Sequence, residues 1–139
     1  MAGRRDYPAL RQRLDASAAV GYTLLEYEPN LGDCLAACDL VLGRAGGSIF
    51  EFMAAGRPAV LVPYPHATAD HQASNAAWMA DNGAAAVLDD AELEPGRLRD
   101  VVAGLIADEE RLKRMSEASR SLSMPDAAKR IALEVLAAA

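Results

Sequence analysis

The chain has 139 residues and carries 14 lysines and arginines against 20 aspartates and glutamates, a formal net charge of −6. Hydrophobic residues make up 52% of it, which excludes a disordered protein, and the acidic balance argues against a nucleic-acid-binding domain, which usually has a basic face. No stretch approaches the roughly 18 consecutive apolar residues of a membrane span. The length is that of one domain covering residues 1–139, and the charged start without an apolar signal core predicts a cytoplasmic protein.

Short apolar runs alternate along the chain with segments of helical spacing. In chain order, the pattern predicts a helix over 6–18, a strand over 22–27, a helix over 31–38, a strand over 39–42, a helix over 48–55, a strand over 59–62, a helix over 70–82, a strand over 84–88, and helices over 95–107, 108–120 and 126–136. This alternation is typical of an α/β fold with a parallel sheet of about four strands and flanking helices. Ligands of such sheets bind at the carboxyl ends of the strands, so we expect the site in the loops after residues 27, 42 and 62.

The loop after residue 42 is rich in glycine. Gly46 and Gly47 precede a predicted helix, and a turn of this kind lets backbone N–H groups approach an anion, with Arg44 as a further fork of donors for phosphate. Ser48 and Glu51 also match the S-x-x-E capping box, in which the two side chains only cap the helix. The local pattern favours the capping role, and the two roles compete for the Glu51 carboxylate.

The loop after residue 62 leads into a helix that carries two amides. Gln72 and Asn75 lie three residues apart on one face, and neutral amides suit the recognition of sugar hydroxyls because they both donate and accept. A solvated helix start is the plainer alternative. His66 and His71 have no partner in ligand register, so no metal site is expected, and nothing predicts a cofactor. The sequence shows no convincing nucleophile and base, which indicates a binding part rather than a complete catalyst.

These motifs together resemble the MurG family, bacterial transferases that move N-acetylglucosamine from UDP-N-acetylglucosamine to lipid I and so form lipid II in peptidoglycan synthesis. The resemblance covers nearly the whole chain and rests on a fairly specific succession of short motifs. They are Y-E-P at 27–29, L-A-A-C-D-L-V at 35–41, R-A-G-G at 44–47, E-F-M-A-A-G-R-P-A at 51–59, V-P at 62–63, D-H-Q-A-S-N-A at 70–76 and M-P-D-A-A at 124–128. The resemblance implies the Rossmann-like, UDP-sugar-binding C-terminal half of a GT-B glycosyltransferase of family 28.

The resemblance also implies roles for individual residues. The backbone near Glu28 would line the uracil pocket with Leu31 beside it, the 46–49 loop would meet the diphosphate, and Glu51 would accept the ribose hydroxyls. Gln72 and Asn75 would hold hydroxyls of the sugar ring. The residues expected to bind the substrate are Glu28, Leu31, Arg44, Gly46, Gly47, Ser48, Ile49, Glu51, Gln72 and Asn75. Arg44 and Glu51 stand one residue closer together here than in the family, so the register of the loop against the phosphates is open.

Other parts of the family pattern have no counterpart in this sequence. The acceptor-binding N-terminal half, the catalytic base that it carries and the first strand of the donor half are absent, and residues 1–5 resemble the end of the second strand. We therefore expect no catalytic residue in this chain and a missing acceptor domain or partner subunit. Membrane contact is expected only of the full-length enzyme, at the cytoplasmic face. The exposed sheet edge predicts self-association, or a helix over 6–18 that covers the edge.

Two other functions fit the same motifs. The chain could be a non-catalytic nucleotide-sugar-binding subunit completed by a partner chain. It could also belong to a related GT-B enzyme, such as another glycosyltransferase or a UDP-N-acetylglucosamine epimerase, because the fold alone does not choose among them.

Overall fold

The structure is a computed structural model that describes residues 1–17 and 21–138. It divides into two compact units, Met1–Cys34 and Leu35–Ala139. The sequence-based expectation of one domain over residues 1–139 stays a prediction.

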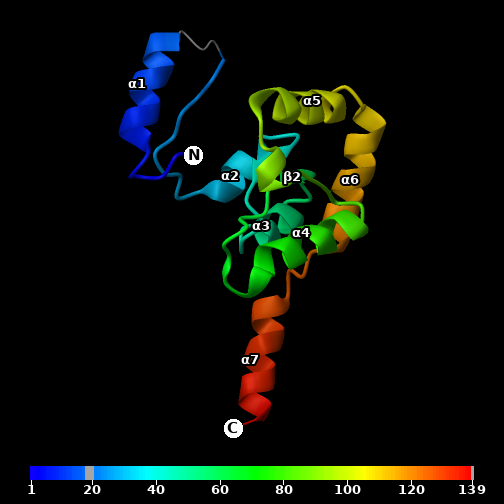
Figure 1. Ribbon diagram of the computed structural model, residues 1–139. Helices are drawn as coiled ribbons and strands as arrows, with labels where there is room; N and C mark the ends of the chain where they lie inside the picture. The colour runs from blue at the N-terminus through cyan, green and yellow to red at the C-terminus, as the bar shows by residue number, and fades with distance from the viewer. Residues whose placement is uncertain (18–20, 139) are drawn as a thin grey trace. The chain divides into compact units, whose positions relative to one another are not determined.

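The first unit is built around one helix and a short backbone pairing. Helix α1, Tyr7–Ser17, confirms the helix predicted over 6–18 as far as residue 17; Ala18 lies outside the described residues (Figure 1). Ala2 donates its N–H to the Leu25 carbonyl at 2.9 Å, and Gly3 donates to the Glu26 carbonyl at 3.1 Å. The strand predicted over 22–27 is wrong, because a strand needs a continuous ladder and this segment pairs with two residues only.

The second unit contains a parallel sheet of three strands. They are β1, Val41–Gly43; β2, Ala59–Leu61; and β3, Ala85–Val87, in the order β1-β2-β3. Gly43 pairs with Leu61, and Leu61 pairs with Val87, so the carboxyl ends of all three strands meet at one edge. The strands predicted over 39–42, 59–62 and 84–88 are confirmed within two residues, and the sheet has three strands instead of about four.

One further helix precedes β1, and helices follow each strand, as the βαβ pattern requires. Their bounds are α2, Leu31–Ala36; α3, Ile49–Ala54; α4, His71–Asp81; α5, Pro95–Ile106; α6, Glu109–Ser121; and α7, Ala127–Ala137, with the short helices η1, Thr68–Asp70, and η2, Asp90–Glu92. Helix α3 connects β1 to β2, and α4 connects β2 to β3. Among the described helices, none is both long and apolar enough to cross a membrane.

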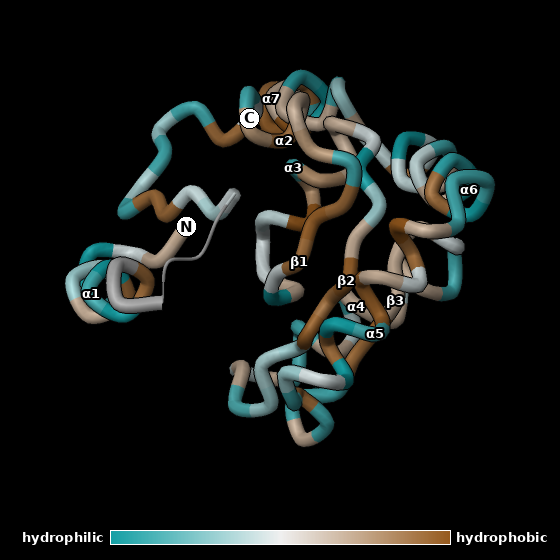
Figure 2. Tube along the Cα trace, turned by 90° about the horizontal axis from the view of Figure 1, so that it is seen from above, coloured by the Kyte–Doolittle hydropathy of each residue, from teal (hydrophilic) through white to brown (hydrophobic). Residues whose placement is uncertain are grey.

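The core lies around the central strand. All three residues of β2 are fully buried, and the strand is brown in the hydropathy colouring of Figure 2. Val60 packs in one cluster with Leu105 of α5 and Met115 of α6. Because successive side chains of a strand point to opposite faces, Ala59 and Leu61 face the other side of the sheet. The buried sheet is the fixed frame from which the loops at its carboxyl edge extend.

Helix α6 is tied to the turn that leads into β2. Gly56 has φ of +62°, a left-handed conformation that favours glycine. Ser116 donates its hydroxyl to the Gly56 carbonyl at 2.7 Å, and Ser119, which is fully buried, donates to the Arg57 carbonyl at 2.9 Å. Two serines three residues apart on one helix thus hold the entry of the central strand.

Candidate functional site

The candidate site lies where the three strand-exit loops meet. The loop after β1 contains Gly46, Gly47 and Ser48, and it turns tightly into α3, with Ile49 donating to the Gly46 carbonyl and Phe50 to the Gly47 carbonyl, each at 3.2 Å. Among the described residues, no group accepts a hydrogen bond from the backbone N–H of Gly46, Gly47 or Ser48. A cluster of unpaired N–H donors before a helix is suited to an anionic ligand.

The capping-box interpretation of this loop is wrong. Ser48 occupies the N-cap position with helical dihedral angles (φ −62°, ψ −16°), and its side chain makes no capping hydrogen bond. An N-cap side chain reaches the helix N–H groups from an extended backbone, so the helical backbone of Ser48 removes the geometry that the box requires.

The Glu51 carboxylate therefore has no capping role at the start of α3. Its carboxylate is exposed in the first turn of α3, and within the part of the chain that the structure describes it has no hydrogen-bond or ion-pair partner. A carboxylate with four unused acceptor positions beside a loop of free N–H donors can bind the hydroxyl groups of a ligand whose anionic part lies on the loop.

The two amides of α4 turn toward the strand-exit loops. Gln72 accepts the Tyr64 N–H on its side-chain oxygen at 3.0 Å, and its amide nitrogen lies 3.9 Å from the position that a Cβ on Gly46 would take. Asn75 donates from Nδ2 to the carbonyl of the buried Ala45 at 2.9 Å. The structure therefore brings Gln72 next to the glycine loop, and it gives Asn75 a bond that holds the residue before that loop.

The start of α4 has an unusual backbone. Ala69 and Asp70 both have φ of +53°, which is uncommon for residues other than glycine, and His71 Nδ1 lies 2.6 Å from the Thr68 carbonyl oxygen. Such strain often accompanies functional loops. No group of three or more His, Cys, Asp and Glu side chains within 1–17 and 21–138 is arranged to hold a metal ion.

Arg44 contacts the exits of the two other strands. Its Nη1 donates to the carbonyls of Val62 and Pro63, each at 3.2 Å, and to the carboxylate of Asp90 in η2. Its guanidinium carbon lies 5.5 Å from the ring centroid of Tyr64, within the range of a cation–π contact. The sequence reasoning missed Asp90, because no local pattern signals a partner 46 residues away.

Glu28 and Leu31 belong to the first unit. Glu28 accepts the Asn30 N–H on its carboxylate at 2.8 Å, and Leu31 is the first residue of α2. Their contact with a ligand stays a prediction.

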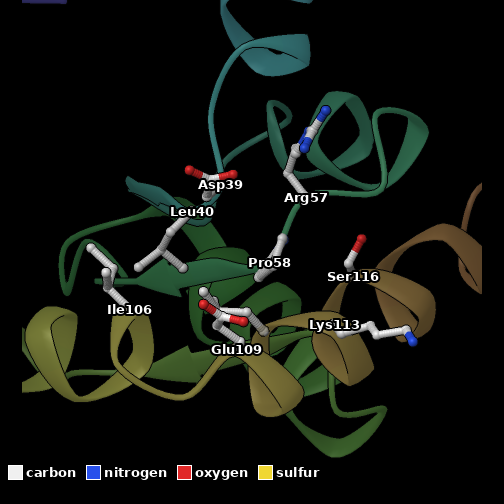
Figure 3. Close-up of a pocket in the computed structure, with 9 residues that line it drawn as sticks. Asp39, Leu40, Arg57, Pro58, Ile106, Glu109, Lys113 and Ser116 are labelled. Atoms are coloured by element: carbon white, nitrogen blue, oxygen red, sulfur yellow. The ribbon is translucent and has the colours of Figure 1, made fainter.

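A cavity of about 590 Å³ lies at the opposite edge of the sheet (Figure 3). Leu40 and Pro58, which line it, directly precede β1 and β2, so it is at the amino ends of these strands. Carboxylates of Asp39 and Glu109 and the ammonium group of Lys113 share its wall. Because ligands of parallel sheets bind at the carboxyl ends and this wall combines both signs of charge, we place the candidate site at the carboxyl edge.

The chain is similar to proteins of known class over nearly its whole length. It is 46% identical, over 96% of the chain, to the UDP-N-acetylglucosamine--N-acetylmuramyl-(pentapeptide) pyrophosphoryl-undecaprenol N-acetylglucosamine transferase of Moorella thermoacetica. It is 40% identical, over 99% of the chain, to the protein of the same name from Rubrobacter xylanophilus. The chain spans 38% and 40% of the lengths of these two curated relatives.

A solved structure and a family comparison agree with these relatives. The crystal structure of Acinetobacter baumannii MurG superposes with a TM-score of 0.81 at 27% identity, covering 93% of this chain and 39% of that one. This match confirms the predicted C-terminal half of a GT-B glycosyltransferase. Residues 2–131 match the glycosyltransferase family 28 C-terminal domain, and the chain therefore belongs to this family.

Proposed function

We propose that this chain binds UDP-N-acetylglucosamine, as the donor-binding part of an inverting glycosyltransferase that transfers N-acetylglucosamine to lipid I and forms lipid II. The names of the relatives support this activity. The observation that carries the proposal is the Glu51 carboxylate, which has no partner among the described residues and stands directly after the free N–H groups of the glycine loop.

The arrangement suits the two ends of a nucleotide-sugar diphosphate. The N–H groups of Gly46, Gly47 and Ser48 bind the diphosphate, Glu51 accepts hydrogen bonds from the ribose hydroxyls, and the Gln72 amide beside Gly46 holds the sugar. As the bond between the sugar and the diphosphate breaks, negative charge grows on the departing UDP. Donors that are already oriented toward that charge stabilise it without reorganisation.

The remaining parts of the reaction lie outside this chain in our proposal. The acceptor site, the base that takes the proton of the attacking hydroxyl and the contact with the cytoplasmic face of the membrane are contributed by an acceptor domain or a partner subunit. The relatives, of which this chain spans 38–40%, have room for such a domain.

Calorimetric titration with UDP-N-acetylglucosamine tests the proposal. We expect saturable binding by the wild-type chain and about 10- to 150-fold weaker binding by Glu51→Ala, since hydrogen bonds to a charged group contribute roughly 1.5–3 kcal/mol. Glu117→Ala removes another exposed carboxylate, on α6, outside the candidate site, and should leave the affinity unchanged. No binding at millimolar ligand, or a preference for a dTDP-deoxysugar, would contradict the proposal.

A further inference from the structure

We infer that Arg44 and Asp90 form a clamp across the three strand-exit loops, which positions the donor-binding loop instead of contacting the phosphates. This inference rests on the proposed function. It makes Asp90 a positioning residue, and it replaces the expected role of Arg44 as a phosphate fork.

The clamp joins the carboxyl ends of all three strands through one side chain. Arg44 follows the last residue of β1, Val62 follows the last residue of β2, and Asp90 lies three residues beyond β3. The two carbonyl contacts at 3.2 Å and the contact with the Asp90 carboxylate all involve Nη1 of Arg44. Because residues 45–48 directly follow Arg44, fixing its side chain fixes the origin of the loop that carries the free N–H groups.

Nη1 of Arg44 and the charge of its guanidinium are already engaged. Nη1 has two N–H groups and faces three oxygen atoms, and the ring of Tyr64 lies 5.5 Å from the guanidinium carbon. The Asp90 carboxylate neutralises the guanidinium, and it would repel a phosphate brought to the same group. The Arg44 side chain is exposed and the Asp90 side chain is half-buried, with 46% and 34% of their surfaces accessible, so water screens part of this contact.

Substitution of Asp90 separates the two roles by the sign of the effect. If Arg44 were a phosphate ligand, Asp90→Asn would free it and strengthen the binding of UDP-N-acetylglucosamine. For a clamp, we expect Asp90→Asn to weaken binding about three- to tenfold, because a neutral amide oxygen then replaces the charged acceptor of Nη1. Asp89→Asn removes the same charge from the exposed neighbouring residue, which makes no side-chain capping bond, and should not weaken binding.

Substitutions of Arg44 complete the test. Arg44→Lys keeps the charge but not the reach of Nη1, so it should weaken binding as much as Arg44→Ala does. The double variant Arg44→Ala/Asp90→Asn should bind no more weakly than Arg44→Ala alone, because both changes disrupt the same interaction between Arg44 and Asp90. Tighter binding by Asp90→Asn, or independent losses in the double variant, would overturn the clamp.

Hydrogen exchange tests the clamp separately from the proposed function. We expect Arg44→Lys and Asp90→Asn to accelerate amide exchange over residues 49–52, whose N–H groups donate to the carbonyls of residues 46–48, to a similar extent, and Asp89→Asn to leave it unchanged. If the wild-type chain does not bind UDP-N-acetylglucosamine, the proposed function fails and the exchange rates alone decide the clamp. Unchanged exchange over 49–52 in both variants would then refute it.

Discussion

Replacing Asn75 with alanine should destabilise the second unit, because the Asn75 amide satisfies a buried carbonyl. Nδ2 donates to the Ala45 oxygen at 2.9 Å, and Ala45 has no exposed surface. Removing one partner of such a bond leaves the other unsatisfied, at a cost of about 1–3 kcal/mol. The unit Leu35–Ala139 holds 105 residues. Its unfolding entropy is then about 0.22 kcal/mol/K, and the midpoint should fall by about 5–14 °C.

Urea and thermal unfolding followed by circular dichroism measure this change. Asn82→Ala is the matched control. Asn82 caps the C-terminus of α4 and donates its side-chain amide to the Trp78 carbonyl at 2.8 Å. This bond is exposed, so water replaces the lost donor. We expect the control to stay within about 0.5 kcal/mol of wild type. Equal effects of the two substitutions, or an Asn75→Ala protein as stable as wild type, would refute the argument from the buried carbonyl.

Two further predictions concern the tie between α6 and the turn before β2. Ser119→Ala should cost about 1–3 kcal/mol and Ser116→Ala less, since Ser119 is fully buried and Ser116 is half-buried; urea unfolding of both variants checks the order. Gly56→Ala should cost about 1–2 kcal/mol for the left-handed backbone and should displace the Arg120 side chain, whose Nε would lie 2.8 Å from the new Cβ; an unchanged unfolding midpoint would contradict this.

The fold could be predicted where one segment contains the whole signal. The apolar run that became β2, the glycine that ends α4 and the proline that begins α5 all stand beside the element they define. The strand predicted over 22–27 is wrong for a reason that lies outside the segment itself. An apolar run becomes a strand only if a neighbour extends along it, and here the backbone of residues 2–3 provides two hydrogen bonds and no more.

The same distinction between local and long-range signals applies to the candidate site. The glycine loop and Glu51 lie within six residues of one another, so their proximity could be predicted from the sequence alone. The bonds that hold the loop join Asn75 to Ala45, 30 residues apart, and Arg44 to Asp90, 46 residues apart. Gln72, Asn75 and Arg44 were singled out for a ligand by their chemistry, and only the folded chain shows that each also holds a neighbouring loop.

The side-chain hydrogen bonds that hold the loops at the two ends of the sheet terminate mostly on backbone atoms. Asn75, Ser116 and Ser119 donate to carbonyl oxygens, and Gln72 accepts from a backbone N–H. A carbonyl oxygen is present whatever side chain its residue carries, and an N–H is present in every residue except proline. Tolerance to substitution should therefore differ between the two partners of each bond. The positions that supply the side chain should be restricted in a saturation library, whereas Ala45, Arg57 and Tyr64 could be exchanged without loss of these particular bonds. Loops at both ends of the sheet can then be redesigned around a small fixed set of side-chain donors and acceptors.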